Sequence, residues 1–162
     1  MKKSMIRIVT ILYRKSQSYL SVALSKYNLT TAEQPFFAAL QVYDGTTQDE
    51  LSALIGVDKS ATARTVKLLE GKGYVKRVQD ETNRRQNRVF ITDTARRLWL
   101  SVEHELIHFN ELLTQHIDAD NLEITYNTLL QMEKNVIYLS INKKTAVEQE
   151  RARYGNENRR RK

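Results

Sequence analysis

The 162-residue chain contains no cysteine, a single proline and only five glycines. The absence of cysteine excludes a disulfide framework, a thiol redox switch and thiolate metal ligands. The scarcity of proline and glycine favours a mostly helical protein, because both residues interrupt helices. No apolar run reaches the roughly 20 residues that a membrane-spanning helix requires, so we expect no membrane partner.

An uninterrupted apolar stretch is also missing near the amino terminus. The first residues are basic, and the amphipathic stretch that follows contains Arg7, Arg14 and Lys15. A secretory signal needs an unbroken apolar centre, so we expect a mature cytoplasmic protein. The length fits a single domain with a sizeable core.

Positive charge is concentrated in one part of the chain. Residues 59–88 contain nine Lys/Arg and three Asp/Glu, a net charge of +6, whereas residues 89–142 carry a net charge of −5. A charge run by itself is usually a solvated face. Its concentration on one segment, beside an acidic one, favours contact with nucleic acid over general stickiness.

Helical spacing of apolar residues predicts a long amphipathic helix over about 5–27. Thr30 and Glu33 form the pattern of a capping box, which predicts that a second helix opens there. Pro35 follows just past the first turn and removes one helical hydrogen bond, so the start of this helix is expected to be distorted.

The segment 46–92 predicts a helix, a turn, a second helix and a two-stranded hairpin, the layout of a winged helix-turn-helix. Thr47 and Glu50 form a capping box for the first helix, and Asp58 caps the second after a turn at Gly56. The first helix is expected to bury Leu51, Leu54 and Ile55.

The second helix of this segment has two different faces. Thr62, Thr65, Val66 and Leu69 are expected to pack inward. The opposite face carries Lys59, Ser60, Ala63, Arg64 and Lys67. In a major groove, the serine and the arginine can each reach a base edge or a phosphate, and the alanine can meet a thymine methyl. The two lysines are better placed to position the helix on phosphates.

A basic hairpin follows. Residues 74–78 and 88–91 alternate as strands do, and the polar residues 79–87 join them. The amide groups near Thr47 and Gln48 lie at a predicted helix start, where they can hold a phosphate.

Long amphipathic helices are predicted on both sides of this segment. One begins at residue 93 and repeats its apolar positions nearly every seven residues, and another begins at about Asp118. So much apolar surface around a small centre favours pairing with a second copy in a two-fold homodimer over packing within one chain. The basic tail 143–162 is expected to extend the last helix and then fray, adding nonspecific DNA affinity or solubility.

An ordered set of short motifs runs from Leu29 to Leu98. The set comprises Leu29-Thr30, Gln48-Asp49-Glu50-Leu51-Ser52, Gly56-Val57-Asp58, Lys59-Ser60 with Arg64, Leu69-Glu70-Gly71-Lys72-Gly73-Tyr74-Val75, and Ile91-Thr92. In this order the motifs resemble the MarR family of bacterial transcriptional regulators.

The resemblance implies a mostly α fold with a small β-hairpin wing. It implies one domain over 1–142, followed by the basic polar tail 143–162. Within that domain, a winged helix-turn-helix spans about 30–92 and is flanked by dimerisation helices at about 5–27 and 93–142.

The resemblance also implies a function. Family members are homodimers that bind pseudo-palindromic double-stranded operator DNA sequence-specifically, usually as repressors. Many release DNA on binding a small, often phenolic, aromatic ligand, and no cofactor is implied. Members often carry threonine at the position of Ala63, so base readout there is expected to differ.

The wing departs from the family pattern. In the family, an arginine at the position of Arg85 enters the minor groove and is braced by an aspartate, but this chain has Asn83 in place of that aspartate. The brace therefore loses its charge unless Asp80 replaces it. Arg84 and Arg88 are expected to contact phosphates.

An effector pocket is implied between the DNA-binding lobe and the dimerisation helices. Each candidate lining residue is aromatic and is, on residue type alone, more often part of a core. These candidates are Tyr13, Tyr19, Phe36, Phe37 and Trp99.

Two histidines are the only hint of a metal site. His104 and His108 lie four apart and so share one helix face. Zinc needs about four ligands, and cysteine is absent. Zinc-sensing relatives take a further histidine from the second helix, where this chain has Glu33-Gln34-Pro35. We expect no metal, with a zinc-responsive repressor kept as an alternative.

Two other classes of function stay open. A winged-helix module binding RNA or protein would share the order of elements, although aromatic stacking motifs typical of RNA binders are missing. A hydrolase would need a nucleophile elbow, a phosphate loop or a His-Glu zinc-protease motif, and none appears. We therefore expect that the protein is not an enzyme.

Overall fold

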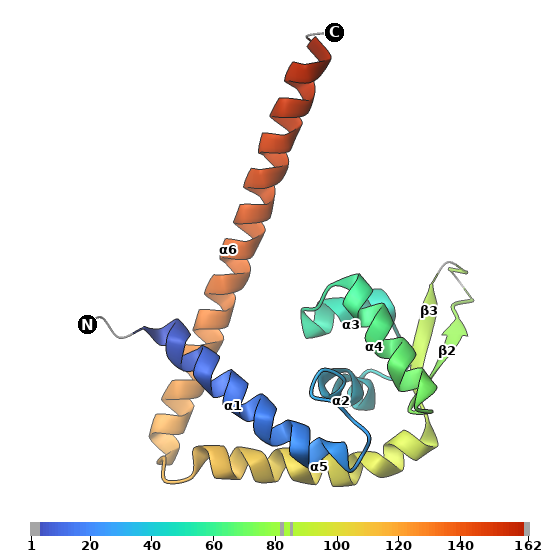
Figure 1. The fold of residues 1–162 in the computed structure, drawn as a ribbon, viewed down its shortest axis with the longest axis vertical. Helices are drawn as coiled ribbons and strands as arrows, with labels where there is room; N and C mark the ends of the chain where they lie inside the picture. The colour runs from blue at the N-terminus through green and yellow to red at the C-terminus, as the bar shows by residue number, and fades with distance from the viewer. Residues whose placement is uncertain (1–3, 82, 85, 161–162) are drawn as a thin grey trace. The chain divides into compact units, whose positions relative to one another are not determined.

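The computed structural model describes residues 4–81, 83–84 and 86–160, with side chains described up to residue 140. The described elements are α1 (Met5–Ser25), α2 (Gln34–Val42), β1 (Thr46–Thr47), α3 (Gln48–Ile55), α4 (Lys59–Gly71), β2 (Val75–Gln79), β3 (Asn87–Ile91), α5 (Asp93–Thr114) and α6 (Ala119–Arg160). The expected mostly α fold with a small wing is confirmed (Figure 1).

Two compact units make up the chain, residues 1–113 and residues 114–162. The second unit is essentially α6, which continues as a helix from Ala119 to Arg160. No break at residue 142 separates a tail from this helix. None of the helices in the described part of the chain is long and apolar enough to cross a membrane.

The first unit has one hydrophobic core. The end of α1, the helices α2 to α4, the strands β2 and β3 and the first half of α5 all contribute to it. Its fully buried large side chains include Leu24, Phe37, Leu40, Leu51, Val66, Leu69, Val89 and Val102. Figure 1 shows α2, α3 and α4 gathered beside the hairpin, so this core fixes the helix-turn-helix against the wing.

The start of α2 differs from expectation. The Thr30 amide donates to Glu33 Oε2 at 2.8 Å, and the Glu33 amide donates to Thr30 Oγ1 at 3.2 Å, so the reciprocal box is present. It closes a turn rather than the helix itself, and the regular helix begins only at Gln34. Pro35 is its second residue, where a missing amide hydrogen costs little.

The capping box at the start of α3 is confirmed, since Thr47 and Glu50 exchange both hydrogen bonds. The expected apolar stripe of this helix is only partly correct. Leu51 is fully buried, but Leu54 is 49% exposed. Ser52 is buried instead and donates its hydroxyl to the Val57 carbonyl at 2.5 Å, because the turn at Gly56 folds back over that face.

The sheet has three strands where the sequence predicted two. The strands β2 and β3 form the expected antiparallel hairpin, and β1 adds to the other edge of β3, giving the order β1-β3-β2. Thr46 pairs with Val89 and Thr47 with Arg88. Thr47, the N-cap of α3, is therefore also paired with the wing strand β3.

Candidate nucleic-acid interface

The helix α4 exposes the face that its spacing predicted. Asp58 caps it, accepting a hydrogen bond from the Ala61 amide at 2.9 Å. Thr62, Val66 and Leu69 are fully buried. The opposite side carries the five expected residues, all exposed: Lys59, Ser60, Ala63, Arg64 and Lys67.

Some of these side chains are engaged with neighbours. The Lys59 ammonium lies 2.7 Å from an Asp49 oxygen, and the Ser60 hydroxyl donates to Asp58 Oδ1 at 2.6 Å. The bond from Ser60 and the Ala61 amide hold the pKa of Asp58 below its usual value. Arg64 and Lys67 have no ion-pair partner among the residues that the structure describes, so their charges face solvent.

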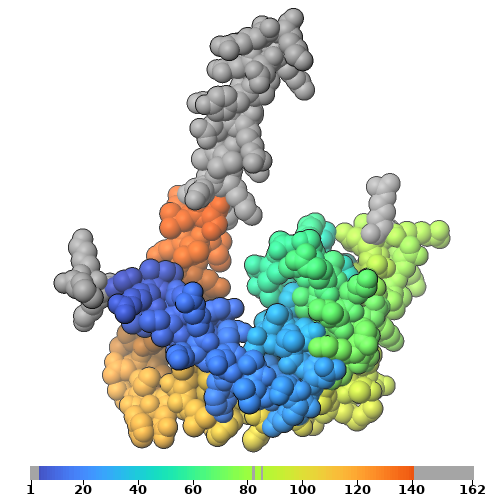
Figure 2. Space-filling model, in the orientation of Figure 1, coloured from blue at the N-terminus to red at the C-terminus, as the bar shows by residue number. Residues whose placement is uncertain are grey.

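The wing lies in the same unit as α4. Figure 2 shows α3, α4 and the hairpin as one continuous surface. Arg84 is exposed near the tip, where its carbonyl accepts a hydrogen bond from Gln79 Nε2 at 2.7 Å. Arg85, the residue expected to enter a minor groove, lies outside the described residues.

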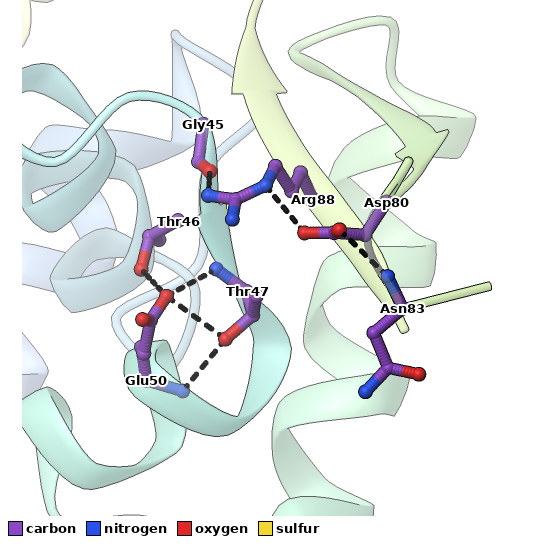
Figure 3. A network of polar contacts seen from close by, with 7 residues as sticks. All are labelled: Gly45, Thr46, Thr47, Glu50, Asp80, Asn83 and Arg88. Carbon is purple, nitrogen blue, oxygen red and sulfur yellow. Dashed lines mark hydrogen bonds and ion pairs between the residues drawn. The ribbon is translucent and has the colours of Figure 1, made fainter. Parts of the chain in front are cut away.

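Arg88 lies on β3, opposite Val78 and one pair from the end of the hairpin where the tip loop begins. Its Nε lies 2.6 Å from Asp80 Oδ2, and its Nη1 donates to the Gly45 carbonyl at 3.0 Å (Figure 3). The Asp80 side chain is 5% exposed, and its Oδ1 accepts a hydrogen bond from the Asn83 amide at 3.0 Å. Arg88 was expected from the sequence to contact phosphate, but its guanidinium is bound to two acceptors within the protein.

At the start of α3, one of the two amides expected to bind phosphate is already occupied. The Thr47 amide donates to Glu50 Oε2 at 2.8 Å, and the Thr47 side chain is buried (Figure 3). Bonds from the Thr47 amide and hydroxyl hold the pKa of Glu50 below its usual value. Of the pair, only Gln48, which is partly exposed, offers an amide at the helix start.

An ion pair that no sequence pattern predicts anchors the carboxyl end of α4. The Lys72 ammonium lies 2.6 Å from Glu33 Oε2 and donates to the Asn28 carbonyl at 2.8 Å. Nearby, the Tyr74 hydroxyl donates to the Tyr27 carbonyl at 2.7 Å. The partners are about 40 residues apart or more in sequence, beyond the reach of any periodic pattern.

The five aromatic residues expected to line one effector pocket are not brought together. Phe36 and Phe37 are buried in the core, and Trp99 packs 6.0 Å from Phe37 between ring centroids. Tyr13 is 63% exposed on α1. Tyr19 borders a cavity, whereas Phe36, Phe37 and Trp99 are taken up by the core.

That cavity lies between α1 and α5 and has a volume of about 590 Å³. Tyr19 stacks on Phe109 next to it, with ring centroids 4.9 Å apart. The cavity wall combines apolar atoms with one cation and one carboxylate. Its lining residues are Lys15, Ser18, Tyr19, Val22, Ala23 and Glu105.

The two candidate metal ligands are exposed on α5. His108 Nδ1 lies 3.8 Å from a Glu111 oxygen. Within the described part of the chain, no three acidic or histidine side chains converge as a metal site would require.

Comparison with known proteins identifies the family. A family model described as the MarR family matches residues 27–86. The crystal structure of a MarR transcriptional regulator from Methanosarcina mazei Go1 is 30% identical, covers 82% of this chain and 96% of its own, and superposes with a TM-score of 0.76. The chain belongs to the MarR family.

Two further proteins are similar to this chain. An uncharacterized HTH-type transcriptional regulator, YybA of Bacillus subtilis, is 22% identical over 131 residues, which are 81% of this chain and 87% of YybA. A Listeria monocytogenes MarR-family structure complexed with 26mer DNA is 18% identical, covers 83% of this chain and 89% of its own, and has a TM-score of 0.77. This MarR-family chain is a transcriptional regulator and not an enzyme.

Proposed function

We propose that this MarR-family protein is a homodimeric repressor that binds pseudo-palindromic operator DNA sequence-specifically. The observation that carries the proposal is the exposed face of α4, which presents Arg64 and Lys67 to solvent in the same unit as the basic wing. A helix with its apolar side buried and its cationic side exposed fits a major groove. The Listeria relative complexed with 26mer DNA supports this mode.

The exposed residues of α4 divide into two roles in this proposal. Ser60, Ala63 and Arg64 face base edges, since they lie in the first half of the helix. Lys59 and Lys67 contact phosphates, which orient the helix without reading sequence. Arg84 and the Gln48 amide add contacts to the backbone.

The decisive variant is Arg64→Ala. Loss of one base-reading arginine is expected to cost about 1–3 kcal/mol of specific binding. Genome-wide footprinting of the purified protein identifies the operator, and titration of that duplex at fixed salt measures the loss. Arg97→Ala, an exposed cation on α5, serves as the control and should bind as the wild type does. Equal affinity of the wild type for operator and random DNA would overturn the proposal.

We also propose that a small aromatic ligand regulates DNA binding. The supporting observation is the cavity between α1 and α5, with its apolar wall and the charges of Lys15 and Glu105. Footprinting repeated with aromatic acids, phenols and zinc tests regulation by an aromatic ligand against the alternative of a zinc-responsive repressor. Competition by duplex RNA at several salt concentrations tests the RNA-binding alternative, because duplex DNA should be preferred at every one.

A further inference from the structure

Arg88 joins two segments that lie far apart in the chain. It is on β3, and through Nη1 it reaches the Gly45 carbonyl, 43 residues earlier, in the turn that leads from α2 into β1. Through Nε it reaches Asp80, at the point where β2 gives way to the wing tip. One guanidinium therefore links the start of the tip loop, at Asp80, to the turn at Gly45 that precedes β1 and α3 (Figure 3).

The Asp80 end of this contact is built into the wing. The carboxylate is almost fully buried and also accepts from the Asn83 amide, while the Asp80 amide donates to the Gln86 carbonyl at 3.0 Å. A buried carboxylate is costly unless it is paired and hydrogen-bonded. The Asp80 carboxylate therefore holds the Arg88 guanidinium in place, and Arg88 in turn compensates the buried negative charge of Asp80.

The Gly45 end is equally specific. The Gly45 amide donates to the Val89 carbonyl at 2.9 Å, so both the amide and the carbonyl of Gly45 are bonded to residues of β3. Gly45 has φ +78°, and a Cβ there would lie 2.7 Å from the Phe90 ring. The close approach of this turn to β3 places the Gly45 carbonyl within reach of the guanidinium.

We propose that Arg88 is a positioning residue that sets the angle of the wing relative to α3 and α4, rather than a phosphate contact. The inference rests on the proposed DNA-binding function. With Asn83 where the family has aspartate, this chain stabilises its wing where the strands meet the tip loop, through Asp80 and Arg88. A planar guanidinium can bridge two separate acceptors, whereas a lysine ammonium is a single point charge.

The test compares charge-conserving and charge-changing variants on the operator duplex. If Arg88 positions the wing, Arg88→Lys should weaken binding about tenfold, the equivalent of one charged hydrogen bond, and should lose protection at the operator flanks as Arg88→Gln does. Arg97→Lys, at an exposed arginine on α5 outside the interface, is the matched control and should keep wild-type affinity and flank protection.

Asp80→Asn gives the sharper contrast. It removes a negative charge close to DNA, so simple electrostatics predicts tighter binding. The positioning role predicts weaker binding, lost flank protection and no further loss when Asp80→Asn is combined with Arg88→Gln. Glu81→Gln, an exposed acid next in the chain, should not weaken binding.

Two outcomes would overturn the inference. One is that Arg88→Lys binds with wild-type affinity while Arg88→Gln reduces, by about 1, the slope of log binding constant against log salt concentration. That pair of results is the signature of a phosphate contact. The other is unchanged or tighter binding by Asp80→Asn. Amide hydrogen exchange of the free protein separates this failure from failure of the DNA-binding proposal. Both Asp80→Asn and Arg88→Lys should speed exchange at β3, whether or not an operator is bound, and unchanged exchange would also refute the positioning role.

Discussion

At the scale of single residues, Glu33 connects the start of α2 to the end of α4. Its side chain is 2% exposed, and it accepts hydrogen bonds from Lys72 and Thr30. Burial by itself raises the pKa of this carboxyl, but the bonds from Lys72 and Thr30 outweigh burial and hold the pKa below its usual value of 4.5. The charged form of Glu33 therefore stabilises the fold.

Glu33→Gln should lower the free energy of unfolding at pH 7 by about 2 kcal/mol, because Lys72 loses a charged partner. A carboxyl with a lowered pKa contributes stability above its unfolded pKa, and this contribution disappears as the pH falls through the folded pKa. Denaturant titrations between pH 7 and pH 3 should therefore show a smaller decline below pH 4.5 for Glu33→Gln than for the wild type. An equal decline in both proteins contradicts the prediction, and Glu123→Gln, an exposed acid on α6, should behave as the wild type.

Gly45 is the second residue with a defined requirement. Gly45→Ala should reduce stability by about 1–2 kcal/mol, since a left-handed backbone is unfavourable for alanine and its Cβ would meet Phe90. Thermal unfolding measures the change. Gly71→Ala is the control, because a Cβ at Gly71 meets nothing within 4 Å, and this variant should lose no stability. Equal stability of the two variants would mean that the approach of the turn to β3 is not tight.

At the scale of elements, sequence patterns predicted whatever depends on near neighbours. The caps at Thr47 and Asp58 and the inward face of α4 follow from contacts within four residues, and they are present. The strand β1 was missed because it is two residues long and pairs with a strand more than 40 residues away. Leu54 was assigned to the core because spacing alone does not reveal that Ser52 turns inward to bond Val57.

The same dependence on near neighbours determines which parts of the candidate interface could be predicted from the sequence. The exposed residues of α4 could be predicted because they share a helix face. The internal partners of Arg88 and the buried Glu33–Lys72 pair could not, because each depends on folded segments meeting in space. Arg88 was expected to contact phosphate because it is a basic residue in a positively charged segment. Only its contacts with Asp80 and Gly45 indicate a different role.

The cap of α3 gives a prediction at this scale. Thr47→Ala removes the acceptor for the Glu50 amide and should cost about 1 kcal/mol of stability, the usual effect of losing an N-cap. Chemical denaturation measures the change. Thr10→Ala is the matched control: the Thr10 hydroxyl bonds only back to the Ile6 carbonyl within α1, and this variant should lose no stability. A loss of the same size at Thr10 would exclude capping as the cause.

At the scale of the whole molecule, each unit leaves apolar side chains exposed. On α1 they include Ile6, Ile8, Ile11 and Tyr13, and on α6 Ile124, Tyr126, Val136 and Tyr138. Helices that expose this many large apolar side chains are typical of an interface. It supports the homodimer of the proposed function, with each terminal helix covered by the second copy.

Ile8→Glu should therefore shift the protein from dimer to monomer, because it would place a charge in the subunit interface. Analytical ultracentrifugation over a range of concentrations measures the shift, and operator affinity should fall with it. Val42→Glu is the control, since Val42 is 74% exposed on α2, outside the terminal helices. A wild type that sediments as a monomer at every concentration would refute the dimer.

The short strand β1 has a consequence for how the chain folds. The β2–β3 hairpin and the helices form through contacts near in sequence, whereas β1 must find β3 across about 43 residues, at a greater cost in chain entropy. We expect β1 to pair late, after its neighbours have acquired their own structure. Since Thr47 is also the N-cap of α3, that late pairing is the step that joins the start of the helix-turn-helix to the wing.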